Sequence, residues 1–418
     1  MNTWHEPARE IPVARDTDVV VAGGGPAGLA AAIASARNGA KTTLVERFGF
    51  LGGVATAGLM ANLNGFRNQV EPDATQTVRG IAEEIVLELK KMNGLGKSPY
   101  PQKAYADEAG QMAYSYAIDT EKVKYVVMKM CADAGVDLLL HTWVAAPIVE
   151  DAKMRGIVVE NKSGREALLA RVVIDATGDG DVAARAGAPF WSSTDESEPR
   201  LGDSLMYRIR FGAKHPADLG GMDFGADMIV WGPFSKTMDG TNADAISKAE
   251  VAARLAVYTN FAAMQAKHPD LVDAKVAETP VMFGVRQTRF IEGEYKVTGD
   301  DAIAGTRFPD SIAMSSCAII GYYGYRRYLT HQGYDIPYRC LVPRVVDQLL
   351  IAGRCISSDQ RAYESHRAMI PMMAIGQAAG TAAALSARQG VAPRRLDVGH
   401  LQRTLTAQGA VIRIPSAG

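Results

Sequence analysis

The sequence has few cysteines and no CxxC pair. Four occur among 418 residues, Cys131, Cys317, Cys340 and Cys355, and they stand far apart. This spacing excludes a recognisable zinc or iron–sulfur site and the dithiol chemistry of disulfide reductases, and it argues against a disulfide framework. Reduced thiols in a cytoplasmic protein are the simplest interpretation, and no metal site is predicted.

An excess of charge and a long apolar run are also missing. The formal net charge is −1, from 45 Lys and Arg against 46 Asp and Glu, and there is no basic stripe. The charge therefore predicts no nucleic-acid partner. The sequence contains no run of about 18 apolar residues, so it predicts no membrane span. The N-terminal segment MNTWHEPAREIPVARD lacks the apolar core of a secretion signal, which again favours the cytoplasm.

Glycine, in contrast, is abundant, and it is concentrated in DVVVAGGGPAGLAAAIASARNGAKTTLVER at residues 18–47. This stretch predicts a strand, a turn, a helix that ends at Arg37, and a second strand. Gly23, Gly25 and Gly28 match G-x-G-x-x-G in that setting. Gly23 would permit the tight turn, Gly25 would let a pyrophosphate approach the backbone, and Gly28 would allow close helix–strand packing.

The residues on both sides of the motif favour a bound dinucleotide over a glycine-rich turn that only connects the strand to the helix. The helix that opens with Pro26 and Ala27 supplies free N–H groups and a partial positive charge. Glu46 ends the next strand, where it is predicted to accept hydrogen bonds from a ribose hydroxyl pair. Its charge disfavours a 2′-phosphate there.

The remaining elements are predicted from periodicity and turn residues. Helices are expected near 78–93, from an Asp119 cap to residue 134, near 241–267, and at 369–389 before Gly390. Residues 145–174 alternate as hairpin strands with a turn at 162–164. Residues 47–66 are predicted as loop and 94–115 as irregular.

Several later stretches resemble one family. RFGFLGGVATAG resembles the second glycine loop of flavoproteins. VVIDATGDGD resembles the "ATG" strand of the glutathione-reductase and p-hydroxybenzoate-hydroxylase class, whose last strand and helix resemble QLLIAGRCISSDQ and GQAAGTAAAL. Residues 284–313 and 335–357 look family-specific as well. The chain therefore resembles the FAD-dependent oxidoreductases built on this FAD-binding fold.

The resemblance implies an α/β fold and FAD as cofactor. The expected architecture is a Rossmann-like FAD-binding domain, with a parallel sheet, helices and a β-hairpin layer, plus an inserted mixed α+β substrate domain. The expected boundaries are 14–190 for the first part of the FAD-binding domain, 191–334 for the substrate domain, and 335–418 for the C-terminal return.

The resemblance also implies the cofactor contacts. Adenine would lie near residues 143–144, and the N-terminus of the helix at 369–389 would stabilise negative charge at flavin N1 and C2=O. Asp179 is expected to bind cofactor hydroxyls, and Asp181 is the weaker candidate. Cys355 leaves covalent attachment open, although bound flavin is expected. The predicted cofactor-binding residues are Gly23, Gly25, Pro26, Ala27, Gly28, Glu46, Arg47, Gly52, Gly53, Val54, Ala55, Thr56, Val144, Gly178, Asp179, Gly353, Arg354, Pro371 and Ala374.

Three residues are the catalytic candidates: His366, Arg286 and Tyr322. His366 lies in RAYESHRAMIP, predicted as a loop near the flavin, and its pKa is expected near working pH. Arg286 and Arg289 are three apart in GVRQTRF, so at most one would enter the pocket if this is a strand. Further candidates around these positions are Tyr323, Tyr325, His331, Arg361, Tyr363, Glu364 and Arg367.

The predicted function is hydride transfer between a small organic substrate and flavin N5, in either direction. A flavin-dependent monooxygenase that uses O2, a tRNA-acting flavoprotein and a flavin-holding protein without turnover are the alternatives. The absence of a second G-x-G-x-x-G leaves the electron donor or acceptor open. The expected partners are therefore a small substrate and an unknown electron partner, with a homo-oligomer possible.

Overall fold

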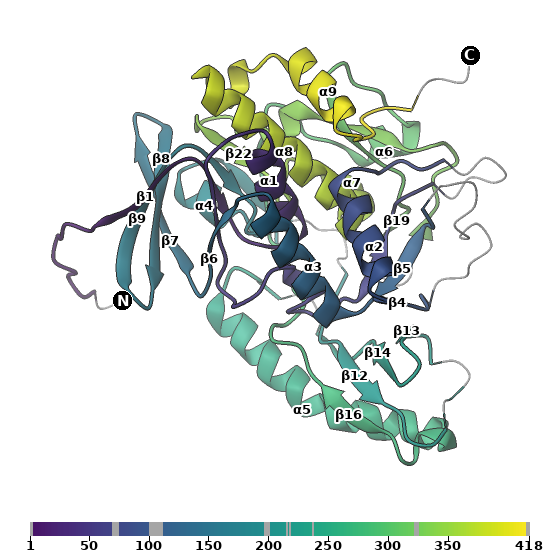
Figure 1. The fold of residues 1–418 in the computed structure, drawn as a ribbon. Helices are drawn as coiled ribbons and strands as arrows, with labels where there is room; N and C mark the ends of the chain where they lie inside the picture. Colours follow the sequence, from purple (N-terminus) through teal and green to yellow (C-terminus); the bar gives the residue numbers. More distant parts are fainter. Residues whose placement is uncertain are drawn as a thin grey trace.

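The computed structural model describes residues 3–68, 75–99, 112–195, 201–214, 216, 219–235, 238–321 and 326–414. Its centre is a seven-stranded sheet in the order β6-β2-β1-β9-β8-β7, with β22 also paired to β9 (Figure 1). The strands are β1 (Val13–Ala22), β2 (Thr42–Val45), β6 (Asp137–Leu139), β7 (Trp143–Glu150), β8 (Lys153–Asn161), β9 (Gly164–Asp175) and β22 (Leu349–Ile351).

The long strand β9 joins two layers. Along one edge its first half pairs antiparallel with β8, and its second half pairs parallel with β22; β1 runs parallel along the other edge. The turn between β8 and β9 falls at residues 162–163, as the alternation predicts. The predicted fold class, a parallel sheet with helices and a hairpin layer, is confirmed.

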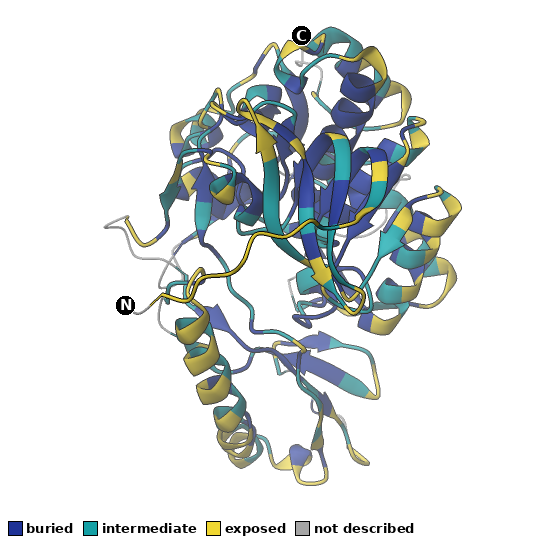
Figure 2. Ribbon diagram, turned by 90° about the vertical axis from the view of Figure 1, so that its left-hand side faces the viewer, coloured by how far each residue is buried: buried dark blue, intermediate teal, exposed yellow. Residues whose placement is uncertain are grey.

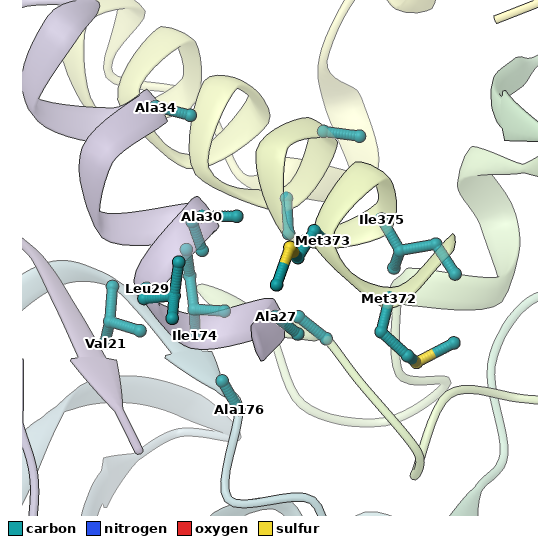
Figure 3. Packing of buried hydrophobic residues seen from close by; sticks show 14 of the residues in the cluster. Val21, Ala27, Leu29, Ala30, Ala34, Ile174, Ala176, Met372, Met373 and Ile375 are labelled. Carbon is teal, nitrogen blue, oxygen red and sulfur yellow. The ribbon is translucent and has the colours of Figure 1, made fainter. Parts of the chain in front are cut away.

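Helices α1 (Pro26–Arg37) and α8 (Met369–Gln389) pack against each other more closely than ordinary side chains permit. A methyl group on Gly376 would lie 2.0 Å from the carbonyl oxygen of Ala27, and one on Gly380 would lie 2.0 Å from that of Ala31. Figure 3 shows the two helices crossing, with the alanines of α1 on the side toward α8. These small residues bring the start of α1 against α8.

The predicted helix ends are confirmed. Asn38 caps the C-terminus of α1, and Gly390 ends α8 in the left-handed conformation with φ 67°. The Asp119 side chain accepts hydrogen bonds from the N–H groups of Glu121 and Lys122 at the start of α3 (Thr120–Asp133). Helix α2 is Ile81–Lys91. Length and composition would let α8 cross a membrane, but 94% of that window is buried inside the structure.

A second, smaller core lies beneath helix α5 (Ala243–Lys267), in the lower part of Figure 1. Here β13 (Met222–Asp223), β14 (Asp227–Val230), β12 (Tyr207–Arg210) and β16 (Lys275–Glu278) form an antiparallel sheet in that order. Val257 and Phe261 of α5 pack on this core, and the Tyr207 hydroxyl lies 2.7 Å from Asn260 Oδ1. The boundaries of the substrate domain stay a prediction.

The remaining elements are short. The paired strands are β10 (Phe190–Ser192) with β17 (Arg289–Ile291), β11 (Asp203–Ser204) with β15 (Phe234–Ser235), β18 (Ser311–Ser315) with β21 (Tyr334–Pro337), β19 (Ile319–Ile320) with β20 (Arg326–Arg327), and β3 (Asn62–Asn64) with β5 (Ser115–Ile118) and β4 (Leu95–Gly96). The short helices are η1 (Gly53–Ala55), α4 (Asp181–Arg185), η2 (Pro269–Leu271), α6 (Gly299–Ala304), η4 (Tyr338–Leu341), α7 (Gln360–His366), η5 (Pro393–Arg395) and α9 (Val398–Ala407).

Two segments predicted as loop contain regular structure. Residues 47–66 include η1 and β3, and the segment that carries His366 is helix α7. Asp359 starts α7, because its side chain accepts a hydrogen bond from the N–H of Ala362. Much of 94–115 lies outside the described residues, but β4 begins at Leu95.

Candidate functional site

The carboxyl ends of four parallel strands lie level with one another. Ala22 at the end of β1 is in register with Val45 of β2 and with Asp175 of β9, and Asp175 is in register with Ile351 of β22. Ligands of open α/β sheets bind outside this edge. The two glycine loops, the DGD turn and Gly353-Arg354 all follow these strand ends.

The three motif positions exclude a side chain for different structural reasons. Gly23 has φ 101°, and a methyl group there would lie 2.6 Å from the Ala176 carbonyl oxygen. One on Gly28 would lie 1.8 Å from the Gly23 oxygen. Gly25 has an ordinary φ of −71°, and the nearest atom to its methyl would be Gly53 Cα at 4.0 Å. Packing explains Gly23 and Gly28, whereas Gly25 faces a space that a side chain would fill.

The N-terminus of α1 opens beside that space. Gly25 is its N-cap, Pro26 takes the first helical position, and neither an acidic side chain in the first turn nor a side-chain cap neutralises it. Its free N–H groups and helix dipole favour an anion. The space at Gly25 and this donor set both fit a diphosphate.

Glu46 is held in a fixed position next to the first glycine loop. It is 6% exposed; Oε2 accepts a hydrogen bond from the Gly24 N–H at 2.8 Å, and Oε1 accepts one from the Phe48 N–H at 3.0 Å. A carboxylate oxygen has more than one acceptor site, so both oxygens still have capacity for hydroxyl donors. The ribose contact stays a prediction.

The second glycine loop lies directly against the first. The Gly52 N–H donates to the Gly24 oxygen at 2.9 Å, and a methyl group on Gly53 would lie 2.8 Å from Gly25 Cα. Thr56 Oγ1 donates to the Leu51 oxygen at 2.8 Å, which closes the loop around Val54 and Ala55. The structure thus brings both predicted loops together at Gly25.

Arg47 marks the outer end of this region. Its guanidinium carbon lies 4.8 Å from the ring centre of Phe48 and 5.2 Å from that of Trp143. Trp143 is 58% exposed, and Val144 follows it on β7. These aromatic groups lie where adenine is predicted.

Asp179 and Arg354 form an ion pair at the ends of β9 and β22. Arg354 Nη2 lies 3.0 Å from Asp179 Oδ1, and Nη1 donates to the Val285 oxygen. A methyl group on Gly353 would lie 3.4 Å from Ala27 Cβ, and Gly178 lies beside the Arg354 guanidinium. Asp181 instead pairs with Arg289 at 2.9 Å. The two carboxylates therefore have different partners, and Arg289 Nη1 also donates to the Asp179 backbone carbonyl at 3.1 Å.

The structure also places the remaining cofactor candidates. Helix α8 begins after Ala368 without a side-chain cap, and Pro371 in its first turn lies against Gly65. Ala374 is half-buried one turn later. Cys355 is completely buried, and burial raises the pKa of its thiol well above the ordinary value. The roles of these residues toward flavin stay predictions.

The expected pKa of His366 is wrong. This residue is completely buried on α7, its Nδ1 lies 3.3 Å from the Tyr334 hydroxyl, and its Nε2 has no hydrogen-bond partner in the described part of the chain. Burial lowers its pKa from 6.5 to about 3. At neutral pH the imidazole is uncharged, so it does not supply the imidazolium form that general acid catalysis would need.

Strand β17 begins only at Arg289, so the premise of one strand carrying both Arg286 and Arg289 is not met. Arg286 precedes β17; its backbone N–H donates to Asp203 Oδ1 at 2.7 Å, and its Nη2 donates to Ser204 Oγ at 3.3 Å. The Tyr363 hydroxyl donates to the Arg286 carbonyl oxygen. Arg286 thus lies between strand β11 and helix α7.

Other candidates have structural partners or lie elsewhere. Arg361 forms an exposed ion pair with Asp300 at 3.0 Å. His331 caps the end of α6: Nδ1 accepts from the Gly333 N–H at 3.1 Å, and Nε2 donates to the Ala302 oxygen at 3.0 Å. Arg367 is half-buried at the end of α7, and Glu364 accepts from Gln360 Nε2 at 3.2 Å. Tyr322, Tyr323 and Tyr325 lie outside the described residues.

Asp175 shapes the site, and the sequence interpretation missed it. It is completely buried and accepts hydrogen bonds from the Thr177 N–H at 3.1 Å, the Thr177 hydroxyl at 2.7 Å and the Ala183 N–H at 2.9 Å. Burial raises the pKa of this carboxyl. The bonds fix the turn that carries Gly178 and Asp179. The available signal was an acidic residue at the end of the apolar strand VVID.

Among curated proteins, the chain is similar to thiamine thiazole synthase of Methanococcus maripaludis, with 31% identity over 172 residues, 39% of this chain and 56% of that protein. It is also similar to digeranylgeranylglycerophospholipid reductase of Methanoculleus marisnigri, with 29% identity over 171 residues, 41% of each chain. The chain thus matches about half of the first relative's length and less of the second's.

Among solved structures, the chain is similar to a geranylgeranyl bacteriochlorophyll reductase-like protein of Thermoplasma acidophilum, with TM-score 0.49 and 16% identity. The match covers 94% of this chain and 83% of that one. The aromatic hydroxylase CabE gives TM-score 0.48 and 16% identity over 94% of this chain and 69% of its own.

A family model covers far more of the sequence than these pairwise matches. The FAD dependent oxidoreductase model matches residues 18–212 and 214–405. Those ranges include both glycine loops, the strand ends that surround Gly25, and the α1–α8 contact. This chain therefore belongs to the FAD dependent oxidoreductase family, and FAD is its cofactor.

Proposed function

We propose that this enzyme transfers a hydride between a small organic substrate and N5 of its flavin. The observation that carries the proposal is the space at Gly25, in front of the uncapped start of α1 and level with the ends of β2, β9 and β22. A cofactor held there by its diphosphate would extend along the sheet edge toward the second core.

The residues around that space divide into binding roles. The backbone of Gly25, Pro26 and Ala27 would hold the diphosphate, and Glu46 would accept from the adenosine ribose. Gly52 and Gly53 would run beside the phosphates. Asp179 and Arg354 would bind the far end of the cofactor, where their ion pair already fixes both side chains. Bound flavin supplies a carrier that takes or gives two electrons at N5.

The chain's own cysteines do not fit a role as electron carriers. All four are free and buried, and burial raises the pKa of Cys317 to about 12. A thiol with so high a pKa is a poor nucleophile at neutral pH. The electrons would therefore pass directly between substrate and flavin. Free thiols also fit the reducing cytoplasm, which is the proposed location.

Arg286 is the proposed substrate-orienting residue. Its guanidinium is permanently charged and offers a fork of donors that suits a carboxylate or carbonyl group. Asp203 holds its backbone, and Phe234 lies under the guanidinium with its ring centre 5.8 Å away. Strands β11 and β15 and helix α7 meet at this position.

His366 is proposed as a positioning residue behind Tyr363. The two rings lie edge to face with centres 6.4 Å apart, and the Tyr363 hydroxyl bonds the Arg286 carbonyl. An uncharged His366 would fix α7 against the Arg286 loop without transferring a proton. Tyr322 remains a candidate on sequence grounds.

The test is anaerobic bleaching of the bound flavin by a panel of small carboxylic acids, amines and alcohols. Reoxidation of the reduced enzyme by activated alkenes tests the opposite direction. We expect one substrate class to react without oxygen. Arg286→Ala should keep its flavin and need about tenfold more of a carboxylate or carbonyl substrate for half-maximal reduction. Arg361→Ala is the matched control and should leave the reaction unchanged, since that arginine pairs with exposed Asp300.

Two results would contradict the proposal. One is a flavin that only a nicotinamide nucleotide reduces, with oxygen consumption coupled to hydroxylation of the substrate. The other is a fully occupied flavin that no member of either panel reduces or reoxidises.

A further inference from the structure

Arg367 is a half-buried arginine without an anionic partner. It lies at the C-terminal end of α7, where its backbone N–H donates to the Tyr363 oxygen at 2.9 Å. Helix α7 leads directly into α8 in the upper part of the molecule, whose interior Figure 2 shows as buried. The Nε of Arg367 is buried without a hydrogen-bond partner, and the guanidinium forms no ion pair with the part of the chain that the structure describes. A partly buried charge of this kind costs free energy unless an anion pairs with it.

Comparable arginines elsewhere in the chain are paired with carboxylates. Arg208 lies 2.8 Å from Asp227, and Arg354 lies 3.0 Å from Asp179. Other half-buried arginines that pair with a carboxylate in the same way are Arg254, Arg289, Arg339 and Arg394. A half-buried guanidinium is therefore ordinarily neutralised within this protein, and Arg367 differs from these six.

The side chains around Arg367 do not supply the missing negative charge. Burial raises the pKa of Cys317 to about 12, and the charge of Arg367 is among the influences that oppose the rise, so this thiol lies near the guanidinium and stays protonated. His366 is uncharged at neutral pH, because burial lowers its pKa to about 3. Glu364 lies one turn earlier on α7, where it accepts a hydrogen bond from Gln360 Nε2 at 3.2 Å and forms no ion pair with Arg367.

Arginines gather around one buried tyrosine at this place. Burial raises the pKa of Tyr363, and the charges of Arg367, Arg354 and Arg286 oppose that rise, so all three lie near its hydroxyl group. Arg354 is paired with Asp179. Positive charge therefore accumulates beside Arg286, the residue proposed above to orient the substrate, and such a site favours an anionic ligand.

We propose that Arg367 binds the carboxylate group of the substrate, which makes the substrate a small carboxylic acid. The assignment rests on the proposed hydride transfer, because it places the substrate at the start of α8, where the flavin ring is predicted. A guanidinium offers a fork of N–H donors that matches the two oxygens of a carboxylate. The first turn of α8 has neither a side-chain cap nor an acidic residue, so its free N–H groups favour the same anion. Arg286 would then orient a second polar group of the substrate.

A carboxylate fits Arg367 better than the cofactor does. The ring of oxidised flavin carries no formal charge, so it would leave the guanidinium unpaired in the resting enzyme. The diphosphate is predicted at Gly25, at the start of α1. Gly376, the residue of α8 that packs on Ala27, lies about 10 Å along the helix axis from Met369 at the start of α8. The diphosphate is therefore too far away to pair with Arg367, and the anion must arrive with the substrate.

Titration of the oxidised, flavin-loaded enzyme with unreactive ligands tests this binding site separately from catalysis. The probes are acetate and benzoate, with acetamide and benzamide as their neutral counterparts. The readouts are the change in the flavin absorbance spectrum and the heat of binding. We expect both carboxylates to bind and the amides to bind at least about tenfold more weakly, because the amides lack the charge that pairs with the guanidinium.

Substitution of Arg367 identifies the group that binds the carboxylate. Arg367→Gln should weaken carboxylate binding by about 30-fold, since it removes both the charge and the fork of donors. Arg367→Lys keeps the charge without the fork and should weaken binding by about fivefold. Arg361→Gln is the matched control on the same helix and should bind as the wild type does, because Arg361 is exposed and paired with Asp300. Flavin content shows that each variant is folded.

The outcomes separate this proposal from the proposed function. Carboxylates that do not bind the wild type, or that bind Arg367→Gln equally well, would overturn the proposal. A flavin midpoint potential that falls in Arg367→Gln while carboxylate binding stays unchanged would also overturn it, because the arginine would then pair with reduced flavin. Carboxylates that bind through Arg367, together with a flavin that no acid reduces, would support the binding site and contradict the proposed hydride transfer.

Discussion

Helices α1 and α8 and helix α5 are all rich in alanine, but their small residues have opposite surroundings. In the first pair, Gly376 and Gly380 lie against backbone carbonyls with no room for a methyl group. On α5, Ala262 and Ala266 face solvent. The comparison teaches that a small residue in a helix marks a close approach only where a neighbouring element occupies the space beside it.

The two regions also differ in how much they bury. The core around α1 and α8 includes the central sheet and the strands that carry Glu46 and Asp175. The core beneath α5 consists of a short sheet and one face of the helix. The predicted cofactor site therefore lies beside the larger of the two cores.

The largest expected effect compares the two regions directly. Gly376→Val should lower the free energy of unfolding by about 3 kcal/mol or more, because its side chain would overlap the Ala27 carbonyl. Ala262→Val on α5 should lower it by only about 0.5 kcal/mol, the cost of a β-branched residue in an exposed helix. Denaturant titration of dilute protein measures both. Equal losses of stability in the two variants would mean that Gly376 and Ala262 are equally tightly packed.

A smaller effect is expected on the pH dependence of stability, because His366 is buried in the region of α1 and α8. The pKa of His366 falls from 6.5 to about 3 on folding, so the unfolded chain takes up a proton between those pH values and the folded chain does not. The stability that folding gains from a neutral, buried His366 is fully present above pH 6.5. It is lost as the pH falls toward 3, because only the unfolded chain takes up the proton. Between pH 7 and pH 5 the loss amounts to about 2 kcal/mol.

His366→Gln removes that contribution, so the stability of the variant should decline less steeply below pH 6.5. Urea titrations of both proteins at several pH values between 7 and 5 provide the measurement. Parallel curves would mean that the imidazole is not buried in its neutral form.

Much of the cofactor region could be predicted from the sequence because its signals are local. The G-x-G-x-x-G turn, the Asn38 and Gly390 helix ends and the Asp119 cap each depend on residues a few positions apart. The register that brings Ala22, Asp175 and Ile351 level is not local, but the βαβ connection makes parallel neighbours the expected arrangement.

The rest depends on contacts between distant residues. The polar run around His366 has no clear hydrophobic period. The signal for a helix there is the N-cap residue Asp359, which is compatible with a loop as well. The low pKa of His366 arises from burial, which periodicity alone does not reveal. The pairing of β12 with β14 and β16 joins short strands with no distinguishing pattern. The different partners of Asp179 and Asp181 are arginines that lie far away in the sequence, Arg354 and Arg289.

The account requires that the space in front of Gly25 holds the diphosphate of FAD. The flavin content of Gly25→Val tests this requirement. The variant should fold with a loss of about 1 kcal/mol, since its φ is ordinary and the space is open, yet retain less than about a tenth of the flavin. Gly135→Ala is the matched control: its φ of 78° costs about 1 kcal/mol with no atom nearby, and its flavin should stay complete. The ratio of flavin to protein absorbance after incubation with FAD and dialysis decides the matter. A Gly25→Val protein that remains fully yellow would contradict the account.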